Sequence, residues 1–163
     1  AFSSATYGLG GTTFKPRTIM CLENIICKIN SNYTHESIFI HEFAHTIQEV
    51  GIKLGDPSLY EEFNQLYLIY KDKVGGECSH IYACDVRELF AEATQVWFGV
   101  TKRTDVNKYV STINDIKQIK NDNISLYDYL KKVYGESEEG KGGIQICNNR
   151  DDRGIFNNCD FCK

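Results

Sequence analysis

Apolar side chains recur at helical spacing over most of the chain after residue 34. The first such pattern covers 34–51, with Thr34 a candidate N-cap and Gly51 a candidate terminating glycine. Four more helices are expected in the same way: one from Asp56-Pro57 to Gly75-Gly76, one over 85–99 behind Asp85, one from about Thr104, and one from Ser125 to Gly135.

The first thirty residues carry a looser alternation of apolar and polar positions. Segments 18–22 and 24–29 have the pattern of short strands. The glycine-rich stretch 7–13 is not followed by Gly-Lys-Ser/Thr, so a turn or strand edge fits it better than a phosphate-binding loop. The sequence therefore predicts one α+β domain over 1–163, with a small N-terminal β-sheet packed on a mainly helical body.

Composition and charge narrow the class of protein. The chain has 163 residues, of which 42% are hydrophobic and 25% charged, as in one globular domain. Its net charge is −4 and no run of Lys and Arg offsets that, which disfavours nucleic-acid and anionic-membrane partners. No apolar stretch approaches the roughly 20 residues that span a bilayer. We therefore expect neither nucleic acid nor membrane as a partner.

Cysteine content and the start of the chain point to an oxidising compartment. Seven cysteines are many for a cytosolic domain of this size. The chain begins at Ala1 with neither Met nor an apolar leader, as a processed chain would. Two N-glycosylation sequons begin at Asn32 and Asn123. These features predict a secreted, extracellular, disulfide-bonded glycoprotein.

The spacing of the cysteines suggests which of them form disulfides but does not determine the pairing. Cys21/Cys27 and Cys78/Cys84 are each six residues apart, which suits short local loops. A third bridge and one free thiol would come from the cysteines of the polar tail 136–163, which such a bridge would fold back: Cys147, Cys159 and Cys162. The C-x-x-C at 159–162 also fits a metal site, but a zinc ribbon needs a second such pair.

The first predicted helix contains His41-Glu42-Phe43-Ala44-His45. Residues four apart lie on the same face of a helix, so both imidazoles can reach one ion. Glu42 follows the first histidine and can reach water on that ion without binding it. This is the layout of a zinc hydrolase, and Phe43 is expected to help pack the helix in place.

A catalytic zinc needs a third protein ligand, and Glu88-Leu89-Phe90-Ala91-Glu92 offers one. Glu88 would complete a His₂Glu site, and Glu92 would hold the free ring nitrogen of a ligating histidine. Three alternatives are open. Glu88 could close a capping box with Asp85, Glu92 could be an exposed helix charge, and His80 could be the third ligand.

Together the two motifs resemble the gluzincin metallopeptidases, and among them the anthrax-lethal-factor-like group that includes the Pro-Pro endopeptidases. That group has H-E-F-x-H followed, some forty residues later, by an E-x-F-A-E helix; in this chain Glu88 lies 43 residues after His45. The resemblance covers 34–99. It implies a zincin-like helical domain, Zn²⁺ as the cofactor, and Glu88 as the third ligand.

The same resemblance implies a tyrosine near the site. The family places a Tyr seven residues before the ligating Glu, where its hydroxyl supports the oxyanion. In this chain Ile81 stands at that position, and Tyr82 follows it. A one-residue shift within the loop between Cys78 and Cys84 would give Tyr82 this role.

We therefore expect a secreted, monomeric zinc-dependent endopeptidase that hydrolyses peptide or protein substrates, with Glu42 as the general base toward metal-activated water. An extended substrate would bind by strand addition beside the site, with 7–13 as part of the rim. One alternative is a secreted, disulfide-rich zinc-binding module, toxin-like or inhibitory, without catalysis. Another is a domain in which the motif binds no metal.

Overall fold

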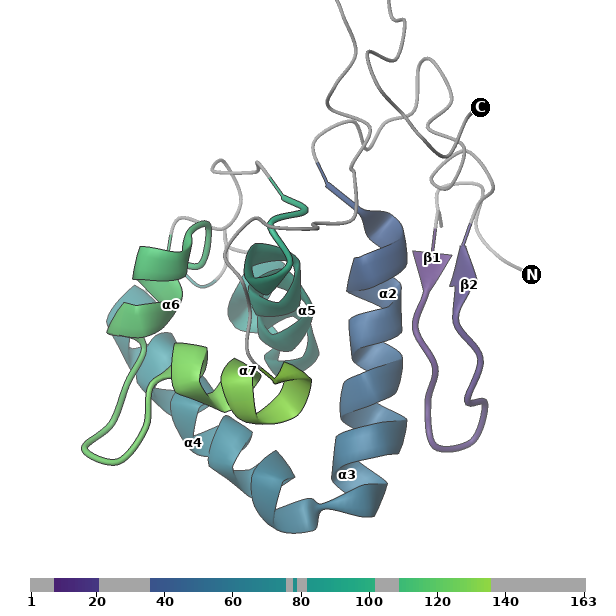
Figure 1. Cartoon of the computed structure of the whole chain (residues 1–163), viewed down its shortest axis with the longest axis horizontal. Helices are drawn as coiled ribbons and strands as arrows, with labels where there is room; N and C mark the ends of the chain where they lie inside the picture. The colour runs from purple at the N-terminus through teal and green to yellow at the C-terminus, as the bar shows by residue number, and fades with distance from the viewer. Residues whose placement is uncertain (1–7, 21–35, 76–77, 79–81, 102–108, 136–163) are drawn as a thin grey trace, which may run out of the picture.

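The computed structural model describes residues 8–20, 36–75, 78, 82–101 and 109–135 (Figure 1). Strands β1 (Gly8–Leu9) and β2 (Ile19–Met20) form an antiparallel hairpin, with Gly8 opposite Met20 and Leu9 opposite Ile19. The helices are α2 (Ile38–Thr46), the π-helical η1 (Ile47–Ile52), α3 (Lys53–Gly55), α4 (Pro57–Val74), the 3₁₀ turn η3 (Tyr82–Cys84), α5 (Val86–Trp97), α6 (Ile113–Gln118) and α7 (Leu126–Tyr134).

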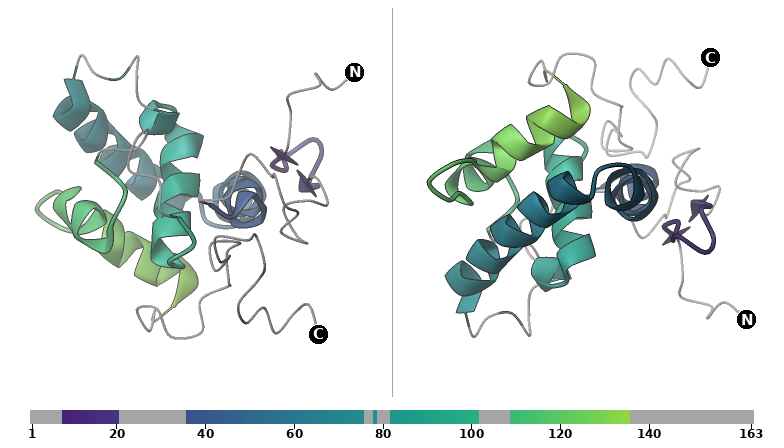
Figure 2. Two further views of the ribbon diagram at one scale, coloured as in Figure 1. Left: turned by 90° about the horizontal axis from the view of Figure 1, so that it is seen from above. Right: turned by 90° about the horizontal axis from the view of Figure 1, so that it is seen from below.

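Helix α2 lies between the hairpin and the other helices. All three views place it there, and it contacts both strands on one side and α5 on the other (Figures 1 and 2). The described part of the chain is thus mostly helical with a small two-stranded sheet, as the α+β prediction required. The predicted strand 24–29 and the tail 136–163 lie outside the described residues.

Three predicted helix starts are confirmed, because each has a side chain that caps its own helix. Asp56 accepts from the Leu59 N–H, and Pro57 fills the first turn of α4. Asp85 accepts a backbone N–H at the start of α5. Ser125 forms a reciprocal capping box at the start of α7.

The predicted bounds of the first helix are wrong at both ends. Ser37 rather than Thr34 is the N-cap, accepting from the Ile40 N–H at 3.4 Å. Gly51 does not end the helix, because it lies within η1 and lacks the positive φ that is common at such ends. The helical path instead continues through η1 and α3 until Asp56 leaves helical geometry.

The fourth helix begins later than the predicted start near Thr104. Residues 102–108 lie outside the described part of the chain, and 109–112 are not helical. Thr112 accepts from the Asp115 N–H and Asp115 accepts from the Thr112 N–H, a capping box that starts α6 at Ile113. The capping box, rather than the apolar periodicity, therefore determines where α6 begins.

Helix α5 is the centre of the core. Every residue from Leu89 to Trp97 is buried, including the polar ones. Its Phe90 meets Phe63 of α4 edge to face at 5.3 Å between ring centroids, and Phe63 lies the same distance from Tyr129 of α7. Because α5 is held on all sides, side chains that project from it toward α2 have a rigid base.

Phe43 does not pack into this core as expected. It is 44% exposed and stacks on Phe39, which is 39% exposed, with ring centroids 5.9 Å apart. Ala44, the next residue and so about 100° further around α2, is fully buried. The face of α2 that packs on α5 therefore includes the small Ala44, while the large Phe43 lies at the surface.

The predicted Cys78–Cys84 disulfide is present, with the two Cα atoms 5.4 Å apart. It joins the loop that follows α4 to η3, directly before α5. The other five cysteines lie outside the described residues. Over the described residues, no helix has the length and apolar character needed to cross a membrane.

Two leucines of α4 provide a matched test of this packing. Leu66 is fully buried, whereas Leu68 is 55% exposed on the same helix. We expect Leu66→Ala to lower the free energy of unfolding by about 2–5 kcal/mol, because it leaves a cavity in the core. Leu68→Ala should cost less than about 0.5 kcal/mol. Urea unfolding measures both, and equal costs would contradict the placement of Leu66 in the core.

Candidate metal centre

The site is formed where α2 and α5 pack against each other. The Ser37 N–H donates to the Val100 carbonyl at 3.0 Å, and Glu36 forms an isolated antiparallel bridge with Thr101. The residues just before α2 are therefore tied to those just after α5. The two helices cross at a steep angle, because α2 is seen along its length where α5 is seen nearly end-on, and the reverse (Figures 1 and 2).

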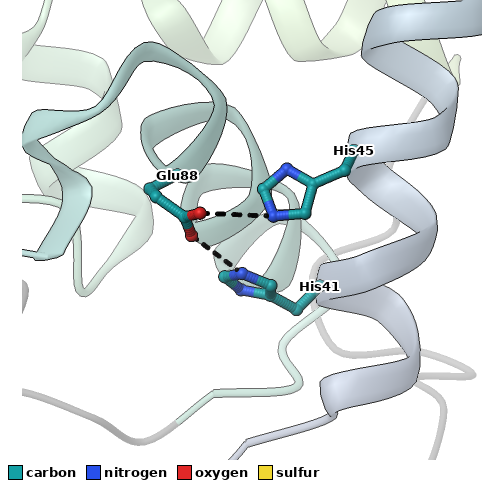
Figure 3. Close-up of side chains that lie close together, drawn as sticks. All are labelled: His41, His45 and Glu88. Atoms are coloured by element: carbon teal, nitrogen blue, oxygen red, sulfur yellow. Dashed lines mark hydrogen bonds and ion pairs between the residues drawn. The ribbon is translucent and has the colours of Figure 1, made fainter. Parts of the chain in front are cut away.

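Three side chains converge between these helices, as Figure 3 shows. His41 Nε2 lies 3.0 Å from Glu88 Oε2, and His45 Nε2 lies 3.5 Å from Glu88 Oε1. The two imidazole rings are nearly perpendicular, with centroids 4.9 Å apart. The structure therefore brings together the three predicted ligands, two from successive turns of α2 and one from α5.

The other nitrogen of His41 is held from α5. His41 Nδ1 lies 3.4 Å from Glu92 Oε1 and 3.4 Å from Gln95 Oε1. Glu92 is 1% exposed, which rules out the alternative that it is an exposed helix charge. It occupies the position expected of a group that orients a ligating histidine.

Gln95 was not predicted from the sequence. Its Nε2 also donates to the Ser37 carbonyl at 3.0 Å, so one buried amide contacts both the His41 ring and the start of α2. The signal that could have found it is its spacing, since Glu88, Glu92 and Gln95 lie at i, i+4 and i+7 on one helix face.

Two groups among the described residues can hold a metal ion, because their ligand atoms lie within 4.8 Å of one another. One is His41, His45 and Glu88, and the other is Glu36, His41 and Glu92. His41 belongs to both. The first group offers two imidazole nitrogens and a carboxylate, the donor set of a catalytic zinc site. The residues present therefore fit a zinc ion.

The pKa values of the two histidines are shifted in opposite directions. Burial by itself lowers the pKa of His41, but hydrogen bonds and charge from Glu88 and Glu92 outweigh it and raise that pKa to about 10. Burial, followed by repulsion from His41, lowers the pKa of His45 to about 4. His45 is thus neutral, the form that binds metal, while a proton on His41 balances the two carboxylates.

Glu42 projects from the face of α2 next to the one that carries His41 and His45. Burial raises the pKa of its carboxyl, and the charge of Glu88 adds to the effect, while His41 and a hydrogen bond from the Gly10 N–H oppose it. A raised pKa makes a carboxylate a better proton acceptor near neutral pH.

Among the described residues, His45 Nδ1 is buried without a hydrogen-bond partner.

Two predicted residues are not placed by the structure. His80 lies outside the described residues. The backbone of Tyr82 is part of η3, but its side chain lies outside what the structure describes. Its role at an oxyanion stays a prediction. The capping-box alternative for Glu88 does not explain the position of its carboxylate, because both carboxylate oxygens lie against the histidines.

The pKa shifts predict how the metal-free protein depends on pH. His41 keeps its proton in the folded chain up to about pH 10, against about 6.5 for an ordinary histidine. The folded state therefore binds more protons, and the free energy of unfolding should fall as pH rises from about 6.5 to about 10. His45 acts in the opposite direction and lowers stability as pH falls from about 6.5 to about 4.

Urea unfolding in the presence of EDTA between pH 4 and 10 measures these slopes. His41→Gln should lose the decline above pH 6.5. An alkaline slope that is the same in the variant and the original chain would contradict a proton held on His41 by the two carboxylates.

Comparison of the chain with protein-family models, with curated proteins and with solved structures found no match. The resemblance of its two motifs to gluzincin peptidases stays a prediction.

Proposed function

We propose that the protein is a zinc-dependent endopeptidase of the gluzincin type, with zinc held by His41, His45 and Glu88. The observation that carries the proposal is the approach of Glu88 to both imidazoles of the H-E-x-x-H helix, within 3.0 and 3.5 Å. These residues come from two helices, and Glu88 follows His45 by 43 positions. A His₂Glu zinc site requires this convergence of the three side chains. A helix that carried two histidines by chance would not require it.

The surrounding charges also favour a cation. Glu88 and Glu92 approach His41 from both sides, and Glu42 lies on the next face of α2. Several carboxylates in a partly buried space need positive charge nearby. A divalent ion in place of the His41 proton supplies that charge. His41 would then bind through Nε2 while Glu92 holds Nδ1 and so fixes the ring.

Zinc bound there would polarise a peptide carbonyl and increase the acidity of water. The chain's own residues would move the protons. Glu42 would accept a proton from the attacking water as general base and deliver it to the leaving amine. From the family resemblance, Tyr82 would donate a hydrogen bond to the developing oxyanion.

The substrate would be a peptide or protein in extended form, taken up by a zincin-like domain acting as a monomer. The hairpin supports this proposal because it lies against the helix that carries Glu42 and has strands with free edges among the described residues. An extended chain can add to such an edge through backbone hydrogen bonds.

We also propose that the protein acts outside the cell. The Cys78–Cys84 disulfide supports this location, because disulfides persist in oxidising compartments. The sequon at Asn123 lies in the turn between α6 and α7, where Asn123 is exposed and within reach of a glycan. Mass spectrometry of the protein from its native source tests both modifications.

Metal content tests the site itself. We expect one zinc per chain by inductively coupled plasma mass spectrometry. His41→Ala and Glu88→Ala should each lose zinc or bind it much more weakly, because each removes a ligand. Glu61→Ala serves as a control, since over the described part of the chain its carboxylate accepts hydrogen bonds from Asn64 and Gln65 on the surface of α4.

Two outcomes would change the assignment. Zinc retained in Glu88→Ala would move the third ligand to Glu92 or His80. An original chain that binds no zinc even after reloading would overturn the proposal and leave a disulfide-bonded domain without a metal.

Cleavage of a peptide library tests the activity. Glu42→Gln should keep its zinc but lose turnover by about 10²- to 10⁴-fold, because the amide cannot accept a proton. Glu61→Gln should cleave normally. Full activity in Glu42→Gln would overturn the mechanism, and a zinc-loaded chain that cleaves nothing would point to the zinc-binding module without catalysis.

A further inference from the structure

The glycine-rich start of the hairpin crosses α2 directly beside the metal ligands. A methyl group at Gly8 would lie 2.5 Å from both Cγ and Oε1 of Glu42. One at Gly10 would overlap His45 Cβ and approach the Glu42 carbonyl at 2.9 Å. Gly11 is buried against Thr46 in the same way. The strand can therefore lie this close to the helix only because these positions lack side chains.

Gly8 differs from the other glycines in what it contacts. Its nearest atoms belong to the far end of the Glu42 side chain, whereas Gly10 lies against the helix backbone and the base of His45. A larger residue at Gly8 would consequently displace the Glu42 carboxylate first. The Gly10 N–H also lies near enough to that carboxyl group to favour its charged form and lower its pKa. The hairpin thus limits the space of the carboxylate at Gly8 and favours its charged form at Gly10.

Thr46 fixes the hairpin to the helix at this place. Its Oγ1 accepts from the Gly11 N–H at 2.7 Å and lies 2.6 Å from Thr18 Oγ1, on the other arm of the hairpin. It also reaches the Glu42 carbonyl at 3.5 Å. One hydroxyl therefore joins both arms of the hairpin to the turn of α2 that carries Glu42.

We propose that residues Gly8–Gly11, tied down by Thr46, are a positioning element that sets where the Glu42 carboxylate lies relative to the metal ligands. The inference rests on the proposed peptidase function, in which Glu42 must lie within hydrogen-bond reach of water. Gly8 positions the carboxylate by leaving space for it, Gly10 by its N–H, and Thr46 by holding the strand in register. This positioning of Glu42 is separate from any pairing of the hairpin edge with substrate.

The test compares Gly8→Ala with Gly55→Ala. A methyl group at Gly55 meets nothing within 4 Å, so this variant controls for the loss of a glycine. Gly8→Ala should lower kcat by about 10- to 100-fold, because displacement of a catalytic group by about 1 Å has effects of this size. KM, zinc content and the thermal midpoint should stay unchanged. Gly55→Ala should match the original chain in all four.

The position of Glu42 can also be read without any substrate. In protein labelled with ¹³C at glutamate carboxyls, the Glu42 resonance is identified by its loss in Glu42→Gln. Gly8→Ala should shift that resonance in the zinc-loaded protein, and Gly55→Ala should not. An unshifted Glu42 resonance in Gly8→Ala would overturn the positioning role whether or not the protein cleaves peptides.

Thr46 gives a second, independent test. Thr46→Val keeps the shape but removes the hydroxyl, so amide hydrogen exchange over residues 8–20 should become faster and kcat should fall. Thr46→Ser keeps the hydroxyl and should restore both. Equal exchange in the two variants would overturn the role of Thr46. An original chain that binds zinc but cleaves no peptide would overturn the proposed function alone, because the carboxyl resonance and the exchange rates still report on the positioning.

Discussion

The contact of the Glu88 carboxylate with two imidazoles is the interaction on which the site depends. It joins α2 to α5 at 3.0 and 3.5 Å, in a space from which most water is excluded. A carboxylate in such a place needs a positive partner, whether a proton on His41 or a divalent ion between the three side chains. The hydrogen bond from the Ser37 N–H to the Val100 carbonyl joins the start of α2 to the residues just after α5 and so helps to hold the two helices together.

The second constraint is the burial of α5 within the core. Its residues from Leu89 to Trp97 are all buried, and aromatic contacts hold it to α4 and α7. Groups on its remaining face therefore have fixed positions. Glu88 faces the two histidines, while Glu92 and Gln95 hold the opposite nitrogen of His41. A buried, rigid helix thus orients a polar site on its neighbour, which preorganises the ligands for an ion.

Helix α2 presents a different chemistry on each face. The histidines face α5, Glu42 and Thr46 face the hairpin, and the stacked pair Phe39 and Phe43 is half exposed. The H-E-x-x-H spacing places the base about 100° around the helix from its ligand neighbour, so ligands and base contact separate elements. The metal site and the position of the base are consequently set by different parts of the fold.

The sequence by itself determined what depends on a few neighbouring residues. Caps at Asp56, Asp85 and Ser125 start helices through their own side chains, and helical periodicity places His41 and His45 on one face. The predicted helix end at Gly51 is wrong because the helical path continues through η1 around that residue. The helix predicted from about Thr104 is not continuous, because 109–112 are not helical and the capping box at Thr112 starts α6. The tertiary structure alone decided that Glu92 and Gln95 are buried against His41, and that Gly8 lies against Glu42. Periodicity fixes which residues share a face, but which element covers that face depends on how distant segments pack.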